Sequence, residues 1–279
     1  MHFAEFKPYE NFLTFEAQSF MNRLIDTHCH LYLEEFSNDL EQVIKRAESE
    51  GVTKFFMPAI DSSQISNLFE TEKRFKGKCI PMMGLHPCSV KENYQVELRM
   101  VQDWLEKRPF AAVGEIGLDY YWDLSFQSQQ VEAFEFQIKL AIRHGLPIMI
   151  HSRNSLDDCI SLVGQYKGQL TGIYHCFSGS LQQAQAIIDL GFYLGIGGVL
   201  TYRNAGLAEV VKEIPLENIV LETDSPYLTP VPFRGKRNES SYLKYVVLKL
   251  AEVKGISVED VAKETTVNAG KIFKELANI

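Results

Sequence analysis

The chain has 279 residues, of which 46% are hydrophobic and 23% charged, and its formal net charge is −8 at pH 7. No apolar stretch approaches the ~20 residues that a transmembrane helix requires, so we expect no membrane span. The negative net charge disfavours nonspecific attraction to nucleic-acid phosphates, although it does not exclude a local basic site.

The first twenty residues lack the basic start and uninterrupted apolar segment of a secretory signal. We treat residues 1–21 as a leader of unknown role and expect a single domain over residues 22–279. The five cysteines are scattered and form no Cys-x-x-Cys pair, which argues against a disulfide framework or a thiolate zinc site. A reducing compartment fits this pattern best, and we expect a cytoplasmic protein.

Apolar segments of strand length alternate with amphipathic helical stretches along the whole chain. Between the strands, apolar residues recur at helical spacing, and glycines at positions 51, 145 and 191 follow as helix stops. This repetition favours a closed (β/α)8 TIM barrel over an open doubly wound sheet, since no Gly-rich phosphate loop follows the first strand. The eight expected strands are residues 23–26, 54–59, 80–85, 111–115, 147–151, 172–175, 192–195 and 219–222.

The first chemical signal is the pair His28 and His30, which follows the first apolar segment. In an extended strand, residues i and i+2 point to the same side, so the two imidazoles can share one partner. We expect that partner to be a metal ion, although such a pair alone is more often made of ordinary strand residues. Cys29 should face the opposite side of the strand.

Other residues of ligand type stand at the ends of later strands, namely Glu115, His151, His175 and Asp224. A parallel barrel gathers the carboxyl ends of its strands at one mouth, so these side chains should converge with the two histidines. Considered singly, each carboxylate has a structural interpretation as a helix cap and each imidazole as a hydrogen-bonded core residue.

Four imidazoles and two carboxylates exceed the three protein ligands of a catalytic zinc, so they favour two divalent ions bridged by Glu115. Mixed nitrogen and oxygen ligation suits zinc, manganese, cobalt or nickel better than magnesium. No Gly-x-Ser-x-Gly elbow offers a covalent nucleophile, which favours a metal-activated water. His86 ends the third strand at the same mouth, either as a substrate contact and proton donor or as loop packing.

Taken together, the motifs resemble the TatD family of metal-dependent deoxyribonucleases, and they come in that family's order. They are Asp26-Thr27-His28-Cys29-His30-Leu31, Gly84-Leu85-His86-Pro87, Val113-Gly114-Glu115-Ile116-Gly117-Leu118-Asp119-Tyr120-Tyr121, Ile150-His151-Ser152-Arg153, His175-Cys176-Phe177-Ser178-Gly179 and Glu222-Thr223-Asp224-Ser225-Pro226-Tyr227-Leu228. The resemblance implies a TIM barrel that hydrolyses DNA phosphodiesters, often as a 3′ to 5′ exonuclease.

The resemblance also implies roles for particular residues. The first ion would be held by His28, His30, Glu115 and Asp224, and the second by Glu115, His151 and His175. Asp224 would orient or deprotonate the attacking water. His86 and Arg153 would lie near substrate, and Arg234 would contact phosphate, as guanidinium holds phosphate oxygens bidentately.

The segment Tyr120-Tyr121-Trp122 offers either a stacking surface for unpaired bases or packing at the barrel rim. Three positions depart from the family's usual pattern: Tyr32 replaces a frequent acidic residue, Asn154 a common Asp, and Ser240 a frequent Pro. None is an expected metal ligand, so they bear on substrate preference and loop shape.

Our leading hypothesis is a two-metal hydrolase of DNA, acting as a 3′ to 5′ exonuclease on single-stranded ends or damaged DNA, with no obligate protein partner. One alternative keeps the metals but changes the bond, toward deacylation of mischarged tRNA or hydrolysis of a small ester or amide. Another alternative is a noncatalytic adaptor protein that uses the barrel to bind a partner.

Overall fold

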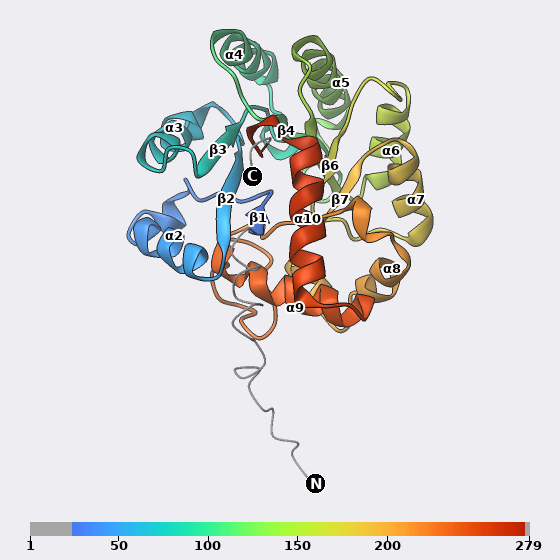
Figure 1. Cartoon of the computed structure of the whole chain (residues 1–279). Coiled ribbons are helices and arrows are strands. Elements are labelled where there is room, and N and C mark those ends of the chain that lie inside the picture. Colours follow the sequence, from blue (N-terminus) through green and yellow to red (C-terminus); the bar gives the residue numbers. More distant parts are fainter. Residues whose placement is uncertain (1–23, 277–279) are drawn as a thin grey trace.

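The computed structural model describes residues 24–276, in which eight parallel strands alternate with helices (Figure 1). The leader expected over residues 1–21 lies outside the described residues. The strands are β1 (Leu24–Asp26), β2 (Val52–Pro58), β3 (Cys79–Met82), β4 (Val113–Asp119), β5 (Ile148–Arg153), β6 (Gly172–Tyr174), β7 (Tyr193–Ile196) and β8 (Ile219–Leu221).

The strands pair in sequence order, as β1-β2-β3 and β4-β5-β6-β7-β8. Short contacts join the two sheets: a bridge between Met83 and Val113 links β3 to β4, and one between Cys29 and Ser225 links the ends of β1 and β8. The amide of Thr27 also donates to the carbonyl oxygen of Leu221 at 3.0 Å. The result is the expected TIM barrel.

Helices cover the outside of the barrel because their apolar faces pack on the outward side chains of the strands. Figure 1 shows this ring of helices around the strands. Gly145 ends α5 in the left-handed conformation, with a φ of +61°, as the sequence predicts. The helices are α2 (Leu40–Ser49), α3 (Ile65–Arg74), α4 (Tyr94–Lys107), α5 (Gln127–His144), α6 (Leu156–Gly164), α7 (Leu181–Asp189), α8 (Leu207–Glu213), α9 (Leu243–Lys254) and α10 (Val258–Ile272).

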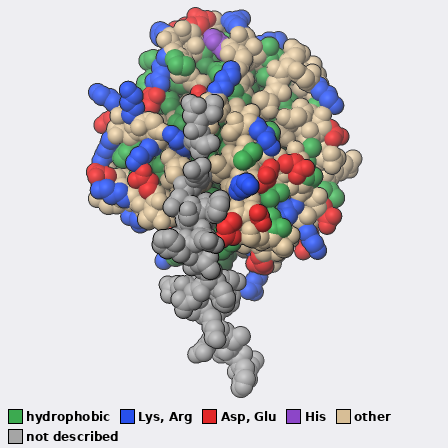
Figure 2. Space-filling model, in the orientation of Figure 1, with side chains coloured by type: hydrophobic (Ala, Val, Ile, Leu, Met, Phe, Trp, Pro, Cys, Tyr) green, Lys and Arg blue, Asp and Glu red, His purple; other side chains and the backbone are tan. Residues whose placement is uncertain are grey.

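The amino-terminal end of the barrel is closed by α10, which crosses it in Figure 1. Inward side chains such as Phe56 and Met149 pack there against Ile272 and Phe273, and the rings of Phe56 and Phe273 stack at 3.9 Å. Figure 2 shows acidic and basic side chains interspersed over this face. The opposite, carboxyl end of the barrel is therefore the open one, where the polar strand-end residues gather.

One strand differs from its prediction in a way that matters for the site. We expected the fourth strand to end at Glu115, but β4 continues to Asp119, and its pairing with β5 shifts register between Val113 and Ile116. Glu115 therefore lies in the middle of a strand. Within residues 24–276, no helix is long and apolar enough to cross a membrane.

Candidate metal centre

The two histidines that follow β1 point into the same space, as their spacing predicts. Their Nε2 atoms lie 3.2 Å apart, and both side chains are buried. The intervening Cys29 faces away, with its thiol 3.6 Å from the carbonyl oxygen of Phe56. His28 and His30 are thus a pair of nitrogen donors aimed at one point.

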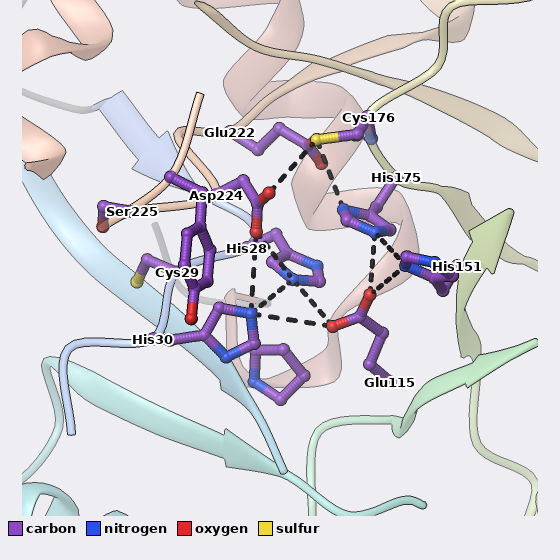
Figure 3. Close-up of polar contacts among 12 residues, drawn as sticks. His28, Cys29, His30, Glu115, His151, His175, Cys176, Glu222, Asp224 and Ser225 are labelled. Carbon is purple, nitrogen blue, oxygen red and sulfur yellow. Dashed lines mark hydrogen bonds and ion pairs between the residues drawn. The ribbon is translucent and has the colours of Figure 1, made fainter. Parts of the chain in front are cut away.

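Glu115 lies between two groups of imidazoles, and each of its carboxylate oxygens faces one group (Figure 3). Its Oε2 is 3.2 Å from Nε2 of His28 and 3.6 Å from Nε2 of His30. Its Oε1 is 2.8 Å from Nδ1 of His151 and 2.8 Å from Nε2 of His175. A single buried carboxylate therefore connects both groups.

Asp224, which follows β8, completes the first group from the side of the barrel where β8 adjoins β1. Its Oδ1 lies 3.6 Å from the Nε2 atoms of both His28 and His30. The backbone amide of Asp224 donates to the carbonyl oxygen of His28 at 2.9 Å, and its φ is +54°. The junction between β8 and β1 thus sets the position of the carboxylate.

The spacing of these atoms fits divalent metal ions. Ligands ~2.1 Å from a metal in tetrahedral geometry are ~3.4 Å from one another. In the first group, the measured separations of the ligand atoms from one another run from 3.2 to 3.6 Å. In the second, the Nδ1 of His151 and the Nε2 of His175 are 3.3 Å apart and share one carboxylate oxygen. The buried histidine and carboxylate clusters are therefore suited to metal binding.

Hydrogen bonds outside the centre set which nitrogen of two histidines is free to bind a metal. The hydroxyl of Tyr32 donates to the carbonyl oxygen of Pro58 at 2.6 Å and lies 3.1 Å from Nδ1 of His30. Nε2 of His151 donates to Oδ2 of Asp119 at 2.9 Å. In each ring the other nitrogen, the one facing Glu115, keeps its lone pair, as is usual for metal-binding histidines.

The charges around the centre favour ionised carboxylates. Burial raises the pKa of Glu115, but the surrounding imidazoles, that of His175 first, outweigh this effect and hold the pKa well below its ordinary value. Burial likewise raises the pKa of Asp224, and the hydrogen bond with His30 is the first of several effects that together lower it. Both side chains are anionic at neutral pH, the form that binds a metal.

His86 also reaches the centre, where it faces Glu115. Its Nδ1 accepts a hydrogen bond from the amide of Cys88 at 3.0 Å, so Nε2 carries the proton of the neutral ring. That Nε2 lies 3.4 Å from Oε1 of Glu115. The ring is therefore oriented as a proton donor toward Oε1 of Glu115, and it lies beside His151 with ring centres 4.5 Å apart.

The expected substrate contacts lie outside this cluster, at or just beyond the carboxyl ends of their strands. The guanidinium of Arg153 stacks 3.7 Å from the ring centre of Tyr121, and Tyr120 donates its hydroxyl proton to Asp158 at 3.0 Å. Arg234 is exposed and stacks 4.0 Å from the ring centre of Tyr202. The structure thus places Arg153 at the last position of β5, and Tyr120 and Arg234 in loops, none of them against the ligand atoms.

Three residues that support the ligands were not assigned a role from the sequence. Asp119 and Tyr32 hold His151 and His30, as described above. Glu222 accepts a 2.5 Å hydrogen bond from the amide of Cys176 and lies 3.7 Å from Nδ1 of His175. The sequence could have indicated two of them, because alternate residues of an extended segment point to the same side. Tyr32 is two residues after His30, and Asp119 is four residues after Glu115.

A parallel barrel whose carboxyl end gathers buried imidazoles and carboxylates defines this chain as a metal-dependent hydrolase. The family described as TatD related DNase matches residues 25–274. The chain belongs to this TatD family, and it is an enzyme of the hydrolase class that acts on ester bonds.

Individual relatives agree with this assignment over nearly their whole length. The uncharacterized metal-dependent hydrolase YabD of Bacillus subtilis is 40% identical over 253 residues, which cover 90% of this chain and 99% of YabD. The 3'-5' ssDNA/RNA exonuclease TatD of Pantoea ananatis is 31% identical, over 90% of this chain and 99% of its own. The crystal structure of the TatD homologue YjjV from Escherichia coli superposes with a TM-score of 0.86 at 32% identity, covering 91% of this chain and 99% of YjjV.

Proposed function

We propose that this enzyme removes nucleotides from the 3′ ends of single-stranded or damaged DNA by hydrolysing phosphodiester bonds. The observation that carries the proposal is the placement of Glu115, whose two oxygens face two separate groups of imidazoles. Paired metals bridged in this way are typical of enzymes that cleave phosphate esters. The exonuclease name of the Pantoea ananatis relative supports the same substrate class.

In this proposal two divalent ions bind per chain. His28, His30, Glu115 and Asp224 hold one, and Glu115, His151 and His175 hold the other. When bound, such ions stabilise negative charge on the phosphate and lower the pKa of a water molecule. The nitrogen-rich ligand set favours zinc, manganese, cobalt or nickel.

Asp224 and His86 handle the protons of the reaction. Oδ1 of Asp224 faces the imidazoles of His28 and His30, while its Oδ2 points away from them, 3.7 Å from the thiol of Cys176. Oδ2 is thus placed to accept a proton from the attacking water as the new oxygen–phosphorus bond forms. The Nε2 proton of His86 passes to the leaving oxygen as the old bond breaks.

Arg153, Arg234 and Tyr120 contact the strand around the centre. Each guanidinium lies over a tyrosine ring, and within residues 24–276 neither forms an ion pair with a carboxylate, which leaves its N–H groups available for phosphate oxygens. In contrast, Arg237 of the same loop as Arg234 is engaged in a bidentate pair with Asp39 at 2.8 Å. Of the two guanidinium groups in that loop, Arg234 is therefore the one available to bind substrate.

We also propose that the enzyme works in the cytoplasm. All five cysteines are free in the described structure, and three of them are buried among apolar side chains. Free thiols persist in a reducing compartment, where disulfide formation is disfavoured.

The proposal is tested by incubating the purified chain with end-labelled single-stranded DNA, with and without a chelator, and then restoring single divalent metals. We expect stepwise shortening from the 3′ end that the chelator abolishes. Glu115→Gln should remove this activity, whereas Glu106→Gln on the outer helix α4 should keep it. Cleavage that persists in Glu115→Gln would contradict the proposed mechanism.

A second experiment distinguishes hydrolysis of phosphodiesters from hydrolysis of carboxylic esters. Arg234→Ala should lower cleavage of single-stranded DNA and spare a small neutral carboxylic ester, because only the DNA presents a phosphate to the missing guanidinium. Equal loss on both substrates would overturn the assignment of Arg234 to phosphate binding.

A further inference from the structure

A cavity of about 440 Å³ lies directly beside the metal centre, between the loops that follow β5 and β6. Ser152 and Cys176 line it, and these residues come immediately after the proposed ligands His151 and His175. Tyr120 and the first turn of α6 also line the cavity. The mechanism proposed above uses none of the polar groups of this cavity except Tyr120.

The charge of the cavity is negative. Asp157 and Asp158 line it, and within the part of the chain that the structure describes no lysine, arginine or histidine does. Both carboxylates are held in place: Gln183 donates to Oδ1 of Asp157 at 2.7 Å, and Tyr120 donates to Oδ2 of Asp158 at 3.0 Å. A phosphate group that entered the cavity would meet two fixed like charges, and such juxtaposition is strongly unfavourable.

The remaining polar groups of the cavity suit an uncharged ligand. The hydroxyls of Ser152 and Ser178 and the side-chain amide of Asn154 each offer both donors and acceptors. Asn154 has a φ of +56°, a conformation that Asn and Asp adopt most readily among residues with side chains. An amide there keeps the loop shape and avoids a third carboxylate.

We propose that this cavity receives the terminal nucleoside of the strand, with a free hydroxyl at its end, while the scissile phosphate stays on the metal side. This inference rests on the function proposed above and adds a requirement to it. The cavity excludes phosphate, so a strand that continues beyond the terminal nucleoside cannot be accommodated. The enzyme therefore acts only from ends and selects a 3′-hydroxyl over a 3′-phosphate.

The test compares three single-stranded substrates of one sequence with the metal-loaded enzyme: one ending in a 3′-hydroxyl, one ending in a 3′-phosphate, and a closed circle. We expect kcat/KM to be at least about tenfold higher for the hydroxyl end than for the phosphate end, and the circle to resist cleavage. The double variant Asp157→Asn/Asp158→Asn keeps acceptor oxygens for Gln183 and Tyr120. It should reduce the discrimination at least about threefold by improving cleavage of the phosphate end.

Asp189→Asn, on the outer helix α7, is the matched charge control and should leave the discrimination unchanged. Equal cleavage of both ends by the wild type would overturn the assignment of the cavity, and so would undiminished discrimination in the double variant. If the wild type cleaves none of the three strands, the proposed function itself fails, and the assignment of the cavity fails with it.

Discussion

The hydroxyl oxygen of Tyr32 lies 3.1 Å from Nδ1 of His30, and its own proton is donated to the carbonyl oxygen of Pro58. The oxygen can therefore only accept from Nδ1–H, which leaves Nε2 of His30 unprotonated and aimed at Glu115. At position 32, where the family often has an acidic residue, the tyrosine hydroxyl thus still provides a hydrogen-bond acceptor for His30, but an uncharged one.

Tyr32→Phe should consequently weaken metal binding while preserving the fold. The ring still fills its buried site, but His30 loses the partner that fixes its tautomer, and such changes typically cost about 10- to 100-fold in metal affinity. Competition with a chelator of known affinity measures the effect. Tyr94→Phe, which removes an exposed hydroxyl far from the centre, is the control. Equal metal affinity in both variants would refute this role for Tyr32.

Gly117→Ala should damage both stability and activity. Gly117 has a φ of +142° and pairs with His151 across β4 and β5, where an added Cβ would collide with the backbone oxygen of His151. Such overpacking against a rigid neighbour costs about 1–3 kcal/mol or more and shifts the proposed metal ligand His151. Urea unfolding measures the loss. Gly270→Ala in α10, where a Cβ meets open space, should instead stabilise by about 0.5–1 kcal/mol.

Glu239→Gln should lower stability at neutral pH and much less in acid. Burial raises the pKa of Glu239, but hydrogen bonds from Arg46 and Ser241 outweigh it and hold the pKa below its ordinary value of 4.5. A depressed folded-state pKa stabilises the fold above that ordinary value, and this contribution is lost as pH falls through the lower one. Neighbouring Asn238 holds the loop of Asp224 by donating to the carbonyl oxygen of Thr223 at 2.8 Å.

Chemical unfolding at pH 7 and pH 3 provides the measurement. Because Arg46 is nearly half exposed, solvent screening limits the expected difference at pH 7 to about 1 kcal/mol. That difference should shrink at pH 3. A stability gap that grows on acidification would contradict the proposed role of the pair.

Trp122→Ala should weaken binding of single strands without affecting chemistry. Trp122 is 67% exposed and lies edge-to-face against Tyr121, and the guanidinium of Arg153 lies 5.1 Å from the centre of its ring. Stacking of a base on such a side chain contributes about 1–3 kcal/mol, so KM for an oligonucleotide should rise about 5- to 150-fold. Leu124→Ala removes a similarly exposed apolar side chain and should not raise KM. Equal KM values for both variants would assign Trp122 to rim packing.

The barrel and the direction of its mouth were predictable because they follow from local patterns. Alternation of strand and helix periodicity marks each βα unit, and the spacing of His28 and His30 fixes their common side without knowledge of any distant residue. The eight expected strands all exist, and none of their ends is shifted by more than four residues.

The remaining features depend on contacts between distant segments. β4 runs on to Asp119 although Gly114 and Gly117 weaken its strand pattern, because the close pairing with β5 requires those glycines. The role of Asp119 depends on His151, 32 residues away, and Arg237 is engaged by Asp39, 198 residues away. Local periodicity carries no information about such pairs.

The number of metal ions per chain tests the central claim most directly. After removal and reloading of a single divalent metal, elemental analysis of the wild type should give two ions per chain. Asp224→Asn should retain the ion held by His151 and His175, whereas Glu115→Gln should lose both, because its carboxylate touches both groups. A wild type that binds one ion or none, or a Glu115→Gln variant that keeps two, would contradict the account.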